Sequence, residues 1–277
     1  MIDFFTLSGI LFSILLGSNI YYYFLGETQS KGKKTPQKNI KSSKKGSNKN
    51  LFITIILIFI ILLITIFVGF FLIKSLTQNV FIFYMATITY VMLLLSFYAI
   101  QQNQNRFLYA FSFASLLLGL QIYLKIPLLG GLLPTIGYIG AVNYIMFKKI
   151  VSPKIILLFL TVYMIYDFIT VFITPLQPAI ANKTINDVFP SAIIYGKTIL
   201  GLGDVLFTLI MTAFSRVYYG FKISVITAFL MSLPLAGLGV YSALIPHSKI
   251  AVPYLILTTP FLLIIVFILK QKGYRLK

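Results

Sequence analysis

The sequence predicts an all-α, polytopic membrane protein with nine transmembrane helices. Two observations predict this fold class. Of the 277 residues, 59% are hydrophobic and only 10% are charged, proportions far outside the range of soluble domains. The apolar residues also gather in stretches of about 18 to 25 residues, and each stretch is long enough to cross a hydrocarbon core about 30 Å thick.

Polar breaks separate the nine apolar stretches. The expected spans are residues 4–25, 51–73, 79–100, 107–124, 126–147, 153–174, 195–215, 222–245 and 250–269. We expect the first to be a retained helix and not a cleaved signal peptide, because Asp3 replaces the basic residues that begin such peptides. The span 126–147 is rich in Gly and Pro, which spanning helices tolerate when their neighbours satisfy the backbone. We expect it to be a bent helix near the centre of the bundle.

The spans and their connections predict one integral membrane domain. It consists of a six-helix part over residues 1–174, an outer loop over 175–194 and a three-helix part over 195–277. Residues 26–50 carry eight lysines and almost no apolar side chains, a composition that cannot bury a core. We expect this segment to be a disordered cytoplasmic loop, and an arm that binds a partner or lipid is the alternative.

The basic residues predict the orientation of the chain. One set of loops, which includes residues 26–50 and the tail after residue 269, holds 18 of the 23 Lys and Arg residues. Because cytoplasmic loops are enriched in Lys and Arg, we expect a multi-pass protein of the cell membrane with its N-terminus outside and its C-terminus in the cytoplasm. The net charge of +18 then reflects contact with anionic lipid head groups, and no nucleic-acid partner is expected.

Acidic residues inside the predicted spans are the candidates for function. Of the five acids, only Asp167 and Asp204 fall within spans, the sixth and the seventh. A carboxylate at mid-membrane costs about 2.5–3.5 kcal/mol on insertion scales, so acids there are functional candidates by default. Counted from Lys154 and Arg216 at about 1.5 Å per residue, the two acids lie at similar depths of roughly 20 and 18 Å.

Two carboxyl groups at one depth are expected to share a proton. Like charges a few ångström apart cannot both ionise in a low dielectric, and no Lys, Arg or His lies in the middle of a predicted span to neutralise them. An aspartic protease uses this state, with one partner as a base toward water and the other as a hydrogen-bond donor to the peptide carbonyl. The alternative is a structural pair.

The residues around both acids resemble the motifs of a known family. They are Tyr166 and Asp167 in the sixth span and Gly201, Leu202, Gly203 and Asp204 in the seventh. These YD and GLGD motifs resemble those of the presenilin and signal peptide peptidase family of intramembrane aspartyl proteases. Within that family, the chain resembles a prokaryotic member of archaeal type. The resemblance implies a presenilin-like bundle, Asp167 and Asp204 as the catalytic pair, and no metal or cofactor.

The family has a third motif, Pro-Ala-Leu, at the start of its ninth span. The matching residues here are Pro253, Tyr254 and Leu255, with Tyr in place of Ala. The resemblance assigns them to substrate binding, because backbone groups freed near a proline can pair with an unwound substrate. The implied substrates are transmembrane helices or remnant signal peptides, and the predicted orientation resembles that of signal peptide peptidase.

Other functions remain as alternatives. A prepilin-peptidase-like GxGD protease is the nearest rival, although Asp204 is followed by apolar residues and not by a basic one. A proton-coupled transporter would also place acids in spans, and a non-catalytic membrane scaffold is a third class. With His247 as the single histidine and no cysteine, zinc, Ser-His and Cys protease sites are not expected. The sequence leaves oligomerisation open.

Overall fold

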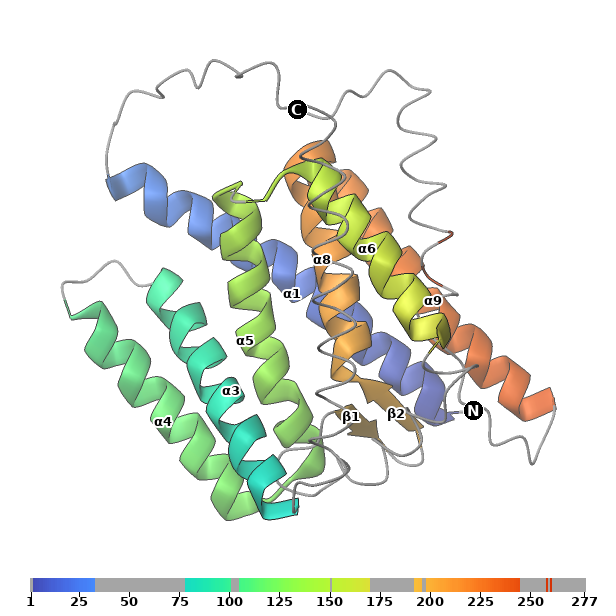
Figure 1. Cartoon of the computed structure of the whole chain (residues 1–277), viewed down its shortest axis with the longest axis horizontal. Helices are drawn as coiled ribbons and strands as arrows, with labels where there is room; N and C mark the ends of the chain where they lie inside the picture. Colours follow the sequence, from blue (N-terminus) through green and yellow to red (C-terminus); the bar gives the residue numbers. More distant parts are fainter. Residues whose placement is uncertain are drawn as a thin grey trace.

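The structure is a computed structural model that describes residues 2–32, 78–100, 105–149, 151–169, 192–195, 198–244, 258 and 260. These residues contain seven helices and one hairpin (Figure 1). The helices are α1 (Ile2–Gly32), α3 (Gln78–Ile100), α4 (Arg106–Leu124), α5 (Pro127–Phe147), α6 (Pro153–Phe168), α8 (Leu202–Tyr219) and α9 (Phe221–Leu244), and the strands are β1 (Ala192–Tyr195) and β2 (Thr198–Gly201).

Five of the helices, α1, α3, α4, α5 and α9, are long and apolar enough to cross a membrane. They confirm the helices expected at 4–25, 79–100, 107–124, 126–147 and 222–245. The expected spans 51–73 and 250–269 lie outside the described residues, except that Thr258 and Pro260 are helical. The count of nine spans therefore stays a prediction.

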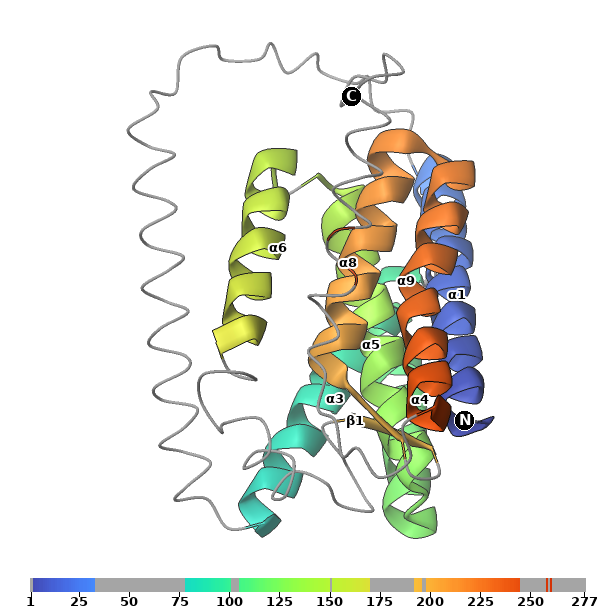
Figure 2. The same ribbon diagram turned by 90° about the vertical axis from the view of Figure 1, so that its right-hand side faces the viewer.

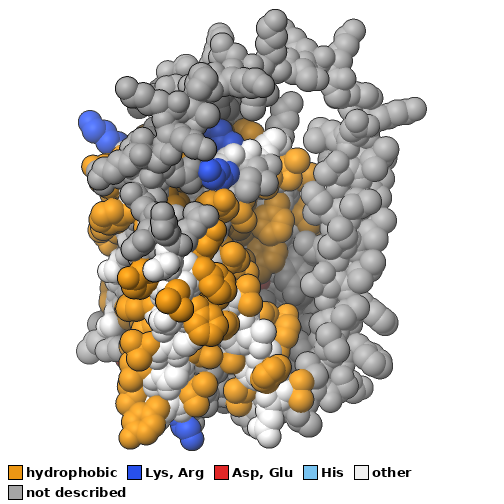
Figure 3. Space-filling model, turned by 90° about the vertical axis from the view of Figure 1, so that its left-hand side faces the viewer, with side chains coloured by type: hydrophobic (Ala, Val, Ile, Leu, Met, Phe, Trp, Pro, Cys, Tyr) orange, Lys and Arg blue, Asp and Glu red, His pale blue; other side chains and the backbone are white. Residues whose placement is uncertain are grey.

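The outer surface has the composition that a membrane-embedded helix bundle needs. Large apolar side chains of α4, such as Phe107, Leu116 and Tyr123, are more than half exposed. Figure 3 shows apolar side chains over most of the described surface on one face, with Lys and Arg toward the two ends of the molecule. Exposed apolar area of this extent is typical of a surface that contacts lipid or protein.

Helix α5 lies at the centre of the described bundle, as expected. It packs against α1, α3, α8 and β1 (Figure 1), and half of its apolar stretch is buried, the largest share among the five candidate spans. Glycines make this close packing feasible. A Cβ atom at Gly137 would lie only 2.5 Å from the Cβ of Met92 on α3, and one at Gly140 would overlap Ser96.

Hydrogen bonds between side chains on different helices fix the packing further. The Asn143 amide on α5 donates to the Ser18 hydroxyl on α1 over 2.7 Å. On the other side of the bundle, the Ser224 hydroxyl of α9 donates to the carbonyl of Thr212 on α8 over 2.8 Å. Bonds of this kind between spanning helices contribute about 0.6 kcal/mol each on average.

The segment before α8 differs from the prediction. We expected a continuous helix from residue 195, but β1 and β2 form an antiparallel pair with Ala192 opposite Gly201, and the helix begins only at Leu202. The prediction for 195–201 was wrong because a short apolar run rich in β-branched residues does not distinguish a strand from a buried helix. Strand β1 also includes residues 192–194, which the sequence predicts as the end of the outer loop 175–194.

Two helix boundaries bear on other predictions. Helix α1 continues to Gly32, so residues 26–32 are helical and do not belong to the predicted disordered loop, whose remainder lies outside the described residues. Helix α6 ends at Phe168, and residues 170–174 of the sixth predicted span are also outside the described part. The sixth span is therefore confirmed only over its first part.

The contact between α5 and β1 yields a test. A Cβ atom at Gly131 would lie 2.5 Å from the carbonyl oxygen of Ala192 and 2.9 Å from the Cα of Ile193. Because backbone atoms cannot move aside cheaply, we expect Gly131→Ala to lower the stability by about 1–3 kcal/mol. Thermal unfolding of the purified protein in detergent measures this change.

Gly119 on α4 provides the matched control, because nothing lies within 4 Å of the Cβ that an alanine would add. Gly119→Ala should raise helix stability by about 0.5–1 kcal/mol. Equal melting temperatures for the two variants would contradict the packing of the hairpin on α5.

Candidate functional site

The two acids predicted to form a pair lie near each other in the structure. Asp167 is in the last turn of α6 with 3% of its surface exposed. Asp204 is in the first turn of α8 and is partly buried. The two carboxyl groups are close enough to interact electrostatically, so the structure brings together the two acids that the sequence singles out.

Aromatic packing determines which face of α6 meets α8. The ring of Tyr163 stacks on that of Phe207 at a centroid distance of 5.9 Å and an interplanar angle of 22°. Tyr163 and Asp167 are four residues apart and therefore lie on the same face of α6. Because Tyr163 contacts α8, Asp167 is on the side of α6 that faces Asp204.

The start of α8 holds the carboxyl group of Asp204. Gly201 is the N-cap residue, with φ −60° and ψ 139°, which makes Asp204 the third residue of the helix. The backbone N–H of Gly201 donates a hydrogen bond to the Asp204 side chain, which accepts it as the side chain of the third helical residue does in a capping box. The helix dipole also favours negative charge in this turn, so the strand-to-helix junction both orients and stabilises a carboxylate.

At both glycines of the GLGD motif, an added Cβ atom would lie close to another side chain. A Cβ atom at Gly203 would lie 2.7 Å from the Tyr163 hydroxyl, and one at Gly201 would lie 3.0 Å from a carboxyl oxygen of Asp204. Leu202, between them, is buried in the main core. The alternation of glycine, leucine and glycine therefore anchors the first turn in the core while it leaves room for α6 and for the acid.

The remaining predicted site residues are not placed by the structure. Tyr166 belongs to α6, but its side chain is not among those described. Pro253, Tyr254 and Leu255 lie outside the described residues. Among the described residues, no group of three or more His, Cys, Asp or Glu side chains could hold a metal ion. The roles assigned to these residues stay predictions.

Sequence reasoning missed two groups that shape the site. The first is Tyr163, whose ring and hydroxyl contact the start of α8. The second is the backbone N–H of Gly201, which binds Asp204. The four-residue spacing from Tyr163 to Asp167 could have identified Tyr163, because residues four apart share one face of a helix. The YD motif instead indicates Tyr166, which directly precedes Asp167. The N–H could be found only after the helix start was known.

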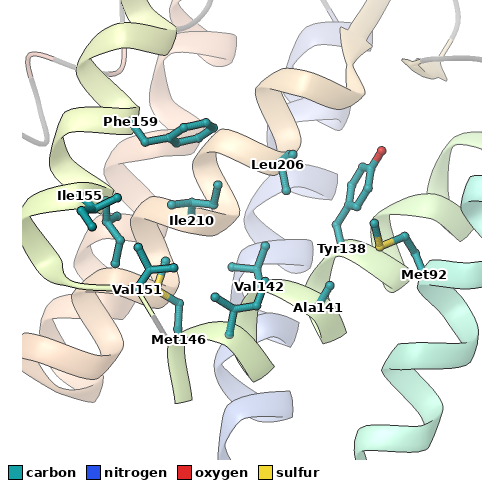
Figure 4. Close-up of a pocket in the computed structure, with 12 residues that line it drawn as sticks. Met92, Tyr138, Ala141, Val142, Met146, Val151, Ile155, Phe159, Leu206 and Ile210 are labelled. Carbon is teal, nitrogen blue, oxygen red and sulfur yellow. The ribbon is translucent and has the colours of Figure 1, made fainter. Parts of the chain in front are cut away.

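An apolar cavity lies between α5, α6 and α8. Its volume is about 450 Å³, and it opens between α5, α6 and α8, with Met92 of α3 at one side (Figure 4). Leu206 in its wall is two residues after Asp204, and Phe159 is two turns before Asp167. The walls are formed by Met92, Tyr138, Ala141, Val142, Ile145, Met146, Val151, Ile155, Ile156, Phe159, Leu206 and Ile210.

Comparisons with protein families, with characterised proteins and with solved structures find no match to this chain.

The proximity of the two acids can be tested directly because the chain has no cysteine. In the double variant Asp167→Cys with Asp204→Cys, a short thiol-specific cross-linker should join α6 to α8. Mass spectrometry of the digested protein would detect the linked peptides.

Ile165 provides the control for this experiment. It lies two residues from Asp167, on another face of α6, and is 45% exposed. Ile165→Cys with Asp204→Cys should not be linked. Equal linking of both pairs would show that α6 is not held in the orientation described.

Proposed function

We propose that this protein is an intramembrane aspartyl protease that hydrolyses peptide bonds within transmembrane segments or remnant signal peptides. The observation that carries the proposal is the proximity of Asp167 and Asp204 across the contact between α6 and α8. The YD and GLGD motifs around them resemble those of the presenilin and signal peptide peptidase family. The close approach of the Tyr163 hydroxyl to Gly203 at this contact further supports the proposal.

The chemistry follows from one proton held between two carboxyl groups. The ionised aspartate accepts a proton from water as the water oxygen attacks the peptide carbonyl carbon. The protonated aspartate donates a hydrogen bond to the carbonyl oxygen and stabilises the tetrahedral intermediate. A proton then passes to the nitrogen, the C–N bond breaks, and the products are a new carboxyl group and a new amine.

A substrate helix must unwind before this attack, because its carbonyl groups are hydrogen-bonded within the helix. The freed backbone groups need new partners inside the membrane. The residues Pro253, Tyr254 and Leu255 are proposed to provide them through strand pairing. The hairpin of β1 and β2 ends at Gly201, three residues before Asp204, so its strand edges offer further donors and acceptors close to the acids.

The proposed location is the cell membrane, with nine spans, the N-terminus outside and the C-terminus in the cytoplasm. The five helices that can cross a membrane support the location. The excess of Lys and Arg in one set of loops supports the orientation. This orientation resembles signal peptide peptidase and selects substrates that run opposite to those of presenilin.

Replacement of either acid tests the function. We expect Asp167→Asn and Asp204→Asn each to reduce the cleavage of a single-span peptide by the purified protein about 100-fold or more, because each variant lacks one of the two proton-transfer groups. Asp3→Asn, in the first turn of α1, which lies on the other side of α8 from α6 (Figure 2), should cleave at the normal rate. Proton-coupled flux without cleavage would instead support a transporter.

The contact of Gly203 with Tyr163 gives a more specific test. We expect Gly203→Ala to push the Tyr163 hydroxyl away and to lower the cleavage rate about 100-fold, as displacements near 1 Å can do. Tyr163→Phe removes that hydroxyl, so the double variant Gly203→Ala with Tyr163→Phe should recover part of the activity. The control is Gly17→Ala on α1, where an added Cβ meets nothing within 4 Å. A double variant no better than Gly203→Ala would contradict the steric account.

A further inference from the structure

The proposed proteolysis does not use the apolar cavity. One end of this cavity lies at the connection between α5 and α6. Met146, near the end of α5, and Val151, just before α6, both line the cavity. The turn that joins these helices runs between them. The cavity therefore extends to the end of the bundle at which α5 and α6 connect (Figure 4).

The turn at this end of the cavity is basic. Lys148 and Lys149 are both exposed, and Lys149 has a left-handed backbone conformation with φ 50°. Directly after the turn, α6 begins at Pro153, and the N-terminus of a helix favours a negative charge. Two cations, of which Lys148 lies over the Tyr144 ring at 5.9 Å, and a helix N-terminus are therefore within a few residues of the cavity-lining Met146 and Val151.

The cavity is large enough for an elongated apolar group. Its volume is about 450 Å³. A single hydrocarbon chain, which is long and thin and carries no polar group, suits both the volume and the apolar walls.

We propose that this cavity binds one acyl chain of an anionic phospholipid, with the phosphate group of the lipid at Lys148 and Lys149. The apolar walls contributed by α5, α6 and α8 enclose the chain, and the basic turn selects the negative head group. The site requires the membrane location proposed above but not the proteolytic activity. A bound acyl chain would fill the space between α5, α6 and α8.

The chain contains no tryptophan, so one introduced tryptophan reports a single place. The probe is Phe159→Trp in the cavity wall, in the full chain reconstituted into vesicles. Acyl-brominated phosphatidylglycerol, which is anionic, is compared with acyl-brominated phosphatidylcholine as a fluorescence quencher. Each lysine is expected to favour the anionic lipid about fivefold, so the two together should give a preference of about 30-fold.

The controls separate a head-group site from general contact with lipid. In Phe159→Trp with Lys148→Gln and Lys149→Gln, the preference should fall close to one, whereas Lys125→Gln, at the turn between α4 and α5, should leave it unchanged. In Phe113→Trp, on the exposed surface of α4, both lipids should quench about equally.

A preference that survives the two lysine replacements, or no preference at Phe159→Trp, would overturn the proposal. Quenching at Phe113→Trp but not at Phe159→Trp would also overturn it, because the cavity would then be closed to lipid or filled by a protein helix. Absence of quenching at both positions would refute the membrane location itself.

Discussion

The contact between α6 and α8 is the constraint on which the candidate site depends. Each helix carries one acid, and neither acid could act on a shared water molecule if the helices packed on other faces. The stacked rings of Tyr163 and Phe207 and the close approach of the Tyr163 hydroxyl to Gly203 set that face. The register of the two acids therefore follows from packing between apolar and small residues and not from any attraction between the acids.

The apolar surroundings explain why polar backbone groups lie close to the carboxyl group of Asp204. An uncompensated carboxylate is costly in a low dielectric, and the junction of β2 with α8 reduces that cost at Asp204. It provides a backbone N–H and the positive end of a helix dipole at the same place. A continuous helix over 195–215 would have satisfied its own N–H groups and left the acid without these partners. The start of α8 at Leu202 therefore allows the strands to pair and also provides Asp204 with its hydrogen-bond donor.

Small residues on α5 connect this site to the rest of the bundle. Gly131 allows β1 to lie against the helix, and Gly137 allows α3 to approach. The hairpin precedes Asp204 directly, so its position on α5 helps to place the start of α8. On its other side, α5 forms part of the apolar cavity that extends between α6 and α8. One central helix thereby supports the acid pair and borders the proposed lipid site.

The sequence alone determined the apolar helical class, most helix positions and the two acids that the structure brings together, because length, hydropathy and the scarcity of charge are local properties of the chain. Only the tertiary structure decided that residues 192–195 and 198–201 form paired strands, that α8 starts at Leu202 and that Tyr163 faces Gly203. Strand pairing and helix packing depend on partners distant in the chain, and a short run such as Thr198 to Gly201 is equally apolar as helix or strand.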